Sequence, residues 1–172
     1  MRTVSLFRHA KSSWDNPGAD DFERPLAKRG EKAAPRMGAF MAETSIVPEL
    51  ILCSPARRTR ETLELVLPHL EPAPIVLAEE PLYLASAATL LARLRQVEAG
   101  IAHVMVIAHD PGLHQLALEL SGRGEAETLH ALASKFPTAA LAVIDFEKAR
   151  DWSRIRPGAG HLRLFMAPKM LP

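Results

Sequence analysis

The stretch Thr3-Val4-Ser5-Leu6-Phe7-Arg8-His9-Ala10 joins a short apolar run directly to an arginine and a histidine. The run has the length and the aliphatic, β-branched composition of a buried strand. Five similar runs follow, separated by longer amphipathic segments. The runs are Thr3–Phe7, Leu50–Cys53, Pro74–Leu77, His103–Ala108, Ala139–Phe146 and His161–Phe165. This alternation is typical of a parallel sheet covered by helices.

The amphipathic segments predict the helices. In one of them Ser86 is a suitable N-cap, and Leu90 and Leu94 then fall on the same helical face. The predicted helices are Gly30–Glu43, Ala56–Leu70, Ser86–Glu98, Gly112–Ser121 and Glu125–Ser134. The sequence therefore predicts a single-domain, three-layer α/β/α fold with a mostly parallel central sheet. We expect residues 1–166 to form the domain and residues 167–172 a C-terminal tail.

Composition narrows the class of protein. The chain has 172 residues, 48% of them hydrophobic, which suits one domain with its own core. Its 21 basic and 20 acidic residues give a formal charge of +1, which argues against a general nucleic-acid or membrane surface. Cys53 is the single cysteine, and neither a signal peptide nor a membrane-spanning run is visible. We therefore expect a cytoplasmic protein without nucleic-acid or membrane partners.

Polar residues follow three of the apolar runs directly. The ligand crevice of such a sheet lies beyond the carboxyl ends of its strands, so these residues are expected to converge. The three blocks are Arg8-His9-Ala10-Lys11-Ser12-Ser13, Ser54-Pro55-Ala56-Arg57-Arg58-Thr59 and His109-Asp110-Pro111-Gly112. The sequence thus predicts one pocket that contains two histidines and several arginines.

Such a pocket is suited to phosphoryl transfer. A neutral imidazole can attack phosphorus in line while guanidinium groups neutralise the equatorial oxygens, and a protonated second imidazole can add to the clamp. No histidine or cysteine spacing of a recognisable zinc or iron site is present, and this chemistry needs no metal or cofactor. Taken singly, a histidine at a strand end is more often structural, and a run such as Arg57-Arg58 is more often a solvated helix face. The conjunction of three blocks favours the functional interpretation.

The residues also resemble a known family. Arg8-His9-Ala10 is similar to the Arg-His-Gly motif of the histidine phosphatase superfamily, with Ala10 in place of glycine. The resemblance continues in order along nearly the whole chain. Its further blocks are Arg24-Pro25-Leu26, Arg29-Gly30, Ser54-Pro55-Ala56-Arg57-Arg58 with Thr62, and Ala108-His109-Asp110-Pro111. The short chain and the sequence Lys11-Ser12-Ser13-Trp14 resemble the SixA branch, whose members are phosphohistidine phosphatases.

The resemblance implies a role for each matching residue. Arg8 would bind the phosphoryl oxygens, His9 would become phosphorylated, Arg58 would be the second phosphate arginine and His109 would complete the clamp. Counted from Ser54, the family's arginine falls on Arg58. Its neighbour Arg57 is therefore not assigned to the core of the site. The implied activity is a phosphatase acting on phosphohistidine in a protein or on small phosphate esters, without a cofactor or a metal.

The proton donor is the weakest part of the match. Many relatives carry a glutamate where this chain has Leu84, so the nearby Glu80 is the candidate donor. Asp110 is the other carboxylate beside a catalytic block, and it is equally suited to capping the following helix. A phosphohistidine substrate needs less help, because a protonated imidazole leaves more readily than an alkoxide. Two alternatives stay open: a non-catalytic module that binds a phosphorylated ligand, and a phosphomutase, for which the chain lacks enclosing insertions.

Overall fold

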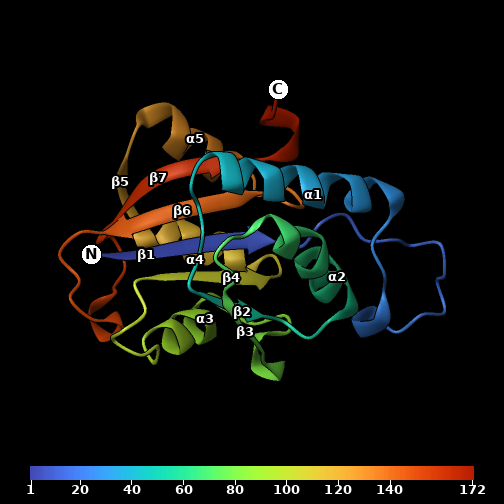
Figure 1. The fold of residues 1–172 in the computed structure, drawn as a ribbon, viewed down its shortest axis with the longest axis horizontal. Helices are drawn as coiled ribbons and strands as arrows, with labels where there is room; N and C mark the ends of the chain where they lie inside the picture. Colours follow the sequence, from blue (N-terminus) through green and yellow to red (C-terminus); the bar gives the residue numbers. More distant parts are fainter.

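A single seven-stranded sheet forms the centre of the molecule (Figure 1), and the computed structural model describes all residues, 1–172. The strands are β1 (Arg2–Arg8), β2 (Leu50–Cys53), β3 (Ile75–Ala78), β4 (His103–Ala108), β5 (Ser121–Gly124), β6 (Leu141–Phe146) and β7 (Gly160–Met166). Their order across the sheet is β3-β2-β4-β1-β6-β7-β5. Only β6 runs antiparallel to its neighbours. The predicted mostly parallel sheet is confirmed.

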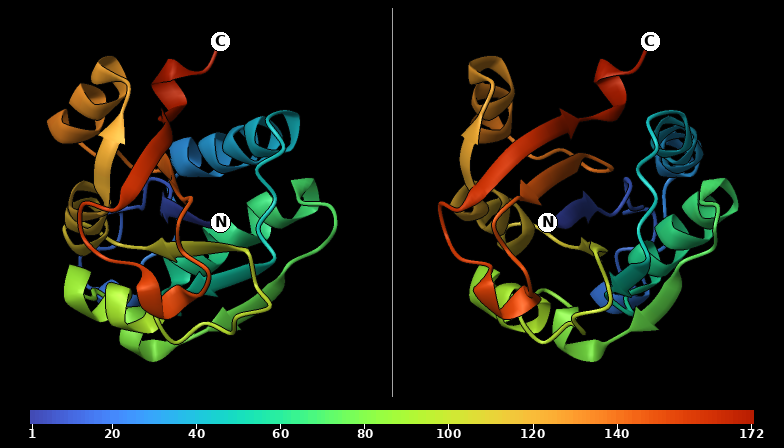
Figure 2. Two further views of the ribbon diagram at one scale, coloured as in Figure 1. Left: turned by 90° about the vertical axis from the view of Figure 1, so that its left-hand side faces the viewer. Right: turned by 60° about the vertical axis from the view of Figure 1, so that its left-hand side comes forward.

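Helices cover both faces of the sheet (Figure 2). They are α1 (Lys28–Glu43), α2 (Arg57–Val66), α3 (Ala87–Leu94), α4 (Gly112–Leu120) and α5 (Ala126–Ser134). Helices α1 and α2 lie on one face, and α3, α4 and α5 lie on the other. Short 3-10 helices complete the chain at Asp21–Glu23, Leu67–His69, Glu80–Leu82, Trp152–Arg154 and Pro168–Met170. The three-layer α/β/α architecture follows from this distribution.

The core divides into two parts because side chains alternate along each strand. In β1, Val4 and Leu6 point toward α3 and α4, whereas Phe7 packs with the residues of α1 and α2. All three side chains are completely buried. A strand that is buried on both faces consists almost entirely of apolar residues, so such strands can be predicted from the sequence.

Three elements differ from the sequence prediction by more than two residues. One of them is helix α2, which ends at Val66 instead of Leu70 because a 3-10 helix, Leu67–His69, follows it. Strand β5 was not predicted, because Ser-Gly-Arg-Gly contains no apolar residue; backbone pairing with β7 creates it. Helix α3 ends at Leu94 instead of Glu98. Val97 nevertheless reaches the same core from the turn after the helix, so the apolar spacing continues where the helix does not.

The end of the chain lies against α1 through the 3-10 helix Pro168–Met170. Ala167 is buried and Leu171 packs on the core beside α1. The division into a domain of residues 1–166 and a tail of residues 167–172 therefore remains a proposal, with a tail that is in contact with the domain. None of the helices has both the length and the apolar character needed to cross a bilayer.

Candidate active site

Three strand ends meet at one edge of the sheet. Strands β2, β4 and β1 are neighbours and run parallel, so their carboxyl ends point the same way. Ser54, His109 and His9 are the residues that directly follow them. The sheet order thus brings together the three sequence blocks that were predicted to converge. Helices α2 and α4 begin a few residues later, so their positive ends also lie near this edge.

His9 is held as a neutral ring with one free nitrogen. Its Nδ1 lies 2.7 Å from the carbonyl oxygen of Ala10. A carbonyl oxygen only accepts, so Nδ1 carries the proton and donates it, and the lone pair is left on Nε2. Burial lowers the pKa of His9 from 6.5 to about 3, and the guanidinium groups of Arg58, Arg8 and Arg24 act in the same direction. His9 is therefore unprotonated at neutral pH.

His109 faces His9 across the pocket. The two ring centroids are 5.3 Å apart, and the ring planes are tilted by 52°. His109 Nε2 lies 2.7 Å from Ser54 Oγ, while Nδ1 is buried without a hydrogen-bond partner. The ring edge contacts Tyr83, with 5.4 Å between centroids. Burial, reinforced by His9, lowers the pKa of His109 to about 3. One nitrogen of His109 is thus left without a protein partner in a buried position.

Arg8 is fixed by a backbone carbonyl and a carboxylate. Its Nη1 donates to the carbonyl oxygen of Phe136 at 2.8 Å and lies 3.5 Å from Asp110 Oδ2. Arg8 Nε is buried without a partner. Burial raises the pKa of Asp110, and the charge of Arg8 opposes that shift. A guanidinium group with an unused donor is thus held beside the nucleophile candidate.

Arg58 and Arg57 have different surroundings. The Arg58 side chain is 4% exposed, and it donates to the Asp21 backbone oxygen at 2.7 Å and to Asp21 Oδ2 at 3.1 Å. The Arg57 side chain is 47% exposed and pairs with Glu61 at 3.4 Å on the surface of α2. Of the two neighbours, only Arg58 is close enough to His9 for its charge to lower the pKa of that histidine, and Arg57 lies on the surface of α2.

Asp21 and Tyr83 belong to the site, although the sequence interpretation did not assign them to it. The Tyr83 hydroxyl donates to Asp21 Oδ2, and Arg24 Nη1 donates to Asp21 Oδ1 at 3.0 Å. The hydrogen bond from Tyr83 is the main reason why the pKa of Asp21 falls to about 2, with Arg24 and Arg58 acting the same way. Asp21 is therefore an ionised carboxylate that links two arginines and a tyrosine.

Arg24 is the third arginine near His9. It is buried and donates hydrogen bonds to Ser12 Oγ and to the Ser13 carbonyl oxygen. Its guanidinium carbon lies 3.3 Å from the centroid of the exposed Trp14 ring. The sequence interpretation quoted Arg24 for the family resemblance without giving it a role. Its signal was the block Arg24-Pro25-Leu26, which carries no periodicity that would place its side chain.

The candidate proton donor Glu80 shares no side-chain interaction with these residues, although its backbone oxygen accepts from the Tyr83 N–H at 3.0 Å. Its side chain is exposed and makes no hydrogen bond or ion pair. Leu84, where a carboxylate was expected, is 55% exposed and has a φ of 51°. The neighbouring Tyr83 is the residue that enters the site from this segment. Glu80 stays a prediction without a structural contact, and Asp110 is the carboxylate beside Arg8.

Two close backbone contacts hold the loops of the site. A Cβ on Gly30 would lie 2.3 Å from the Lys11 carbonyl oxygen, so glycine lets α1 pack on the loop after His9. A Cβ on Gly112 would lie 1.9 Å from the Ala85 carbonyl oxygen, so glycine lets α4 begin against the segment after Tyr83. Either position would resist substitution.

Ala10, which stands where the family motif has glycine, fits its place. Its side chain is completely buried beside the residues of α1. Its N–H donates to Thr62 Oγ1 at 3.0 Å, and that hydroxyl in turn donates to the Arg58 carbonyl oxygen at 2.7 Å. The departure from glycine therefore leaves the loop connected to α2.

The site is a cationic cluster of side chains around two neutral imidazoles. Three guanidinium groups surround His9, and the only carboxylates among them are those of Asp21 and Asp110. No group of three or more His, Cys, Asp or Glu side chains is arranged to hold a metal ion. The arrangement suits a tetrahedral oxyanion close to a nitrogen nucleophile.

Comparisons with known proteins identify the family. Residues 4–80 match the family model of the histidine phosphatase superfamily (branch 1). An uncharacterized protein of Mycobacterium tuberculosis is 32% identical over 165 residues, which cover 94% of this chain and 99% of that protein. SixA from Agrobacterium tumefaciens is 30% identical with a TM-score of 0.78, over 97% of this chain and 98% of that one. The protein histidine phosphatase SixA in complex with tungstate is 27% identical with a TM-score of 0.76, over 97% of each chain. This chain belongs to the histidine phosphatase superfamily and is of the SixA type.

Proposed function

We propose that this protein is a phosphatase whose nucleophile is Nε2 of His9. The observation that carries the proposal is the hydrogen bond from His9 Nδ1 to the Ala10 carbonyl oxygen, which leaves the lone pair on Nε2. The depressed pKa keeps this nitrogen unprotonated at neutral pH. Histidine needs no separate base for the attack, because its nucleophilic nitrogen carries no proton.

The proposed reaction has two displacements at phosphorus. Nε2 of His9 forms a bond to phosphorus while the bond to the leaving oxygen or nitrogen breaks, and the leaving group takes up a proton. Water then attacks the phosphohistidine, the P–N bond breaks, and inorganic phosphate leaves with His9 neutral again. Arg8 and Arg58 neutralise the phosphoryl oxygens in both steps.

His109 would respond to the substrate. Its pKa is low in the free protein, mainly because it is buried, and a bound phosphate dianion favours its protonated form. Its Nδ1 has no protein partner, so it has the capacity to bind a phosphoryl oxygen. The tungstate bound to the SixA relative is a tetrahedral oxyanion of the same shape as phosphate, which supports an oxyanion pocket here.

The proposed substrates are phosphohistidine in a protein and small phosphate esters with good leaving groups. Asp110 is the carboxylate beside Arg8, and burial raises its pKa, whereas the Glu80 side chain makes no hydrogen bond or ion pair. A site with so little acid assistance suits a leaving group that departs easily. The relative described as a protein histidine phosphatase supports the choice of phosphohistidine.

Single-turnover labelling tests the proposal. The protein is mixed with phosphoramidate, quenched in alkali, which preserves phosphohistidine, and digested for mass spectrometry. We expect the label on His9 and none in His9→Ala, with unchanged circular dichroism in the variant. Binding of phosphate without any covalent label would show a binding module. A label on another residue would refute the assignment of the nucleophile.

A further inference from the structure

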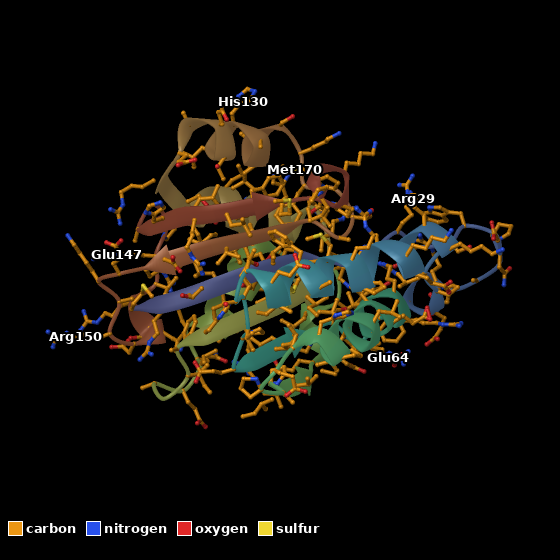
Figure 3. All side chains as sticks on the ribbon, turned by 45° about the horizontal axis from the view of Figure 1, so that its top comes forward. Arg29, Glu64, His130, Glu147, Arg150 and Met170 are labelled. Atoms are coloured by element: carbon orange, nitrogen blue, oxygen red, sulfur yellow. The ribbon has the colours of Figure 1, made fainter.

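A basic groove lies beside the candidate active site. It has a volume of about 710 Å³ and runs between the first turns of α1, the end of α5 and the Pro168–Met170 turn. Arg29, His130 and Met170, which are labelled in Figure 3, are among its lining residues. Six lysines and arginines line it: Lys11, Arg29, Lys32, Arg36, Lys135 and Lys169.

The charge of this groove is not neutralised by the protein. No Asp or Glu is among the lining residues. None of the six cations takes part in an ion pair within 4.0 Å. The whole chain carries a formal charge of only +1, so the groove is a local concentration of positive charge. Such a groove attracts an anionic partner.

Apolar residues line the groove together with the cations. They include Ala33, Ala131, Pro137, Phe165 and Met170. A free phosphate would make no use of these apolar side chains, and single-stranded nucleic acid would need exposed aromatic faces for stacking, whereas Phe165 is only 6% exposed. A lining that combines apolar and cationic side chains is complementary to a protein segment that carries apolar residues on one side and carboxylates beside them.

One chain segment connects the groove to the residues around His9. The Phe136 carbonyl oxygen accepts from Arg8, and the next residue, Pro137, lines the groove. The Ala139 N–H donates to the carbonyl oxygen of His9 at 3.0 Å. One short segment therefore touches Arg8 and the backbone of His9 and also lines the groove, and Lys11 reaches the groove from two residues beyond His9. A ligand in the groove is thus held by residues that neighbour His9 along the chain.

We propose that this groove docks an acidic, apolar-faced segment of the phosphorylated protein that presents its phosphoryl group to His9. The inference rests on the proposed function and adds the class of substrate: a phosphoprotein whose surface near the phosphorylated residue is acidic. Docking of this kind raises the local concentration of the phosphoryl group at the site. It acts through residues that do not touch the phosphoryl group.

A binding experiment tests the groove independently of catalysis. Two fluorescent, unphosphorylated peptides of equal length are compared by anisotropy at low salt. One combines Leu and Ala with Asp and Glu, and the other has Asn and Gln at the acidic positions. We expect wild type to bind the acidic peptide about tenfold more tightly, since several partly exposed charge pairs contribute together. The triple variant Lys32→Glu/Lys135→Glu/Lys169→Glu should lose this preference.

A second cationic surface provides the matched control. Lys148, Arg150 and Arg156 line a separate cavity of about 600 Å³, and Figure 3 shows Arg150 at the opposite end of the molecule from Arg29. The variant Lys148→Glu/Arg150→Glu/Arg156→Glu makes the same change in net charge. It should keep the preference for the acidic peptide. Equal losses in the two triple variants would show a general charge effect and overturn the proposal.

Turnover of the same peptides, each carrying one phosphohistidine, completes the test. In wild type, kcat/KM should be about tenfold higher for the acidic peptide than for the neutral one. In the triple variant Lys32→Glu/Lys135→Glu/Lys169→Glu the two values should be nearly equal. The activity of each protein is normalised to its hydrolysis of p-nitrophenyl phosphate. No preference for the acidic peptide in binding would overturn the groove proposal, even if phosphatase activity is present. Tighter binding to phosphatidylglycerol vesicles than to the peptide would overturn it in favour of a membrane. Specific binding without any turnover would contradict only the proposed function.

Discussion

Replacing Arg58 with alanine is the sharpest test of the arginine clamp, because Arg57 beside it serves as a control. Arg58 is buried, and two of its N–H groups are directed by Asp21. Arg57 is about half exposed and contacts only Glu61. The two substitutions remove the same side chain from adjacent positions of α2. Their effects should differ because their surroundings differ.

The expected magnitudes follow from these surroundings. Loss of one preorganised charge at a phosphoryl transition state costs on the order of 100-fold in rate, or about 2.7 kcal/mol. We therefore expect Arg58→Ala to lower kcat/KM by about that factor. Arg57→Ala removes an exposed ion pair worth roughly 0.2–1 kcal/mol, so kcat/KM should stay within about fivefold of wild type even if all of this energy were lost from the transition state. Asp21 keeps its hydrogen bonds from Tyr83 and Arg24, which limits the structural damage.

The assay is steady-state hydrolysis of p-nitrophenyl phosphate, with circular dichroism and urea unfolding to show that both variants fold. An Arg58→Lys variant separates charge from geometry, since lysine keeps the charge but loses the paired donors. We expect it to recover only part of the loss. Equal losses in the two alanine variants, or a larger loss for Arg57→Ala, would refute the assignment and shift the register of the site by one residue.

Three further predictions concern pH, the leaving group and the tyrosine. In the folded protein the pKa values of His9 and His109 are about 3, whereas in the unfolded chain they are near the ordinary value of 6.5. Between these two pH values the unfolded chain therefore binds more protons than the folded protein. Stability should therefore fall as pH drops from about 6.5 toward 3, and His9→Gln should flatten this dependence in urea titrations. Values of kcat/KM should rank phosphohistidine and aryl phosphates above alkyl phosphates. If Asp110 protonates the leaving group, Asp110→Asn should make kcat/KM depend more steeply on the pKa of the leaving group. If Glu80→Gln has this effect instead, Glu80 is the acid. Tyr83→Phe removes the main cause of the low pKa of Asp21, so the acidic limb of the pH–rate profile should move upward, and an unmoved limb would show that this link has no role in catalysis.

The strands were the most predictable part of this fold. A parallel strand buried on both faces is nearly continuous in apolar residues, so β2 and β4 were located to the residue. Strand β5 was missed because Ser121–Gly124 has no apolar pattern and pairs through its backbone alone. The prediction depends on apolar residues, which β3 carries even though its side chains are exposed and which β5 lacks.

Some residues of the candidate site could also be predicted from the sequence. His9, Arg58 and His109 follow predicted strands or begin a helix, so their place at one edge could be inferred. Asp21 and Tyr83 could not be inferred in this way. Asp21 begins the 3-10 helix Asp21–Glu23 and Tyr83 follows the 3-10 helix Glu80–Leu82, and single turns of this kind are too short to give a helical or strand period.

The sequence by itself determined which segments are strands and helices and which polar residues follow them, because these properties depend on neighbours along the chain. Only the tertiary structure decided which strand ends meet. The order β2-β4-β1 places Ser54, His109 and His9 together, although they are far apart in sequence. It also decided that α1, α5 and the chain end enclose a basic groove beside them. Such contacts depend on strand order and loop path, and these result from packing of the whole core.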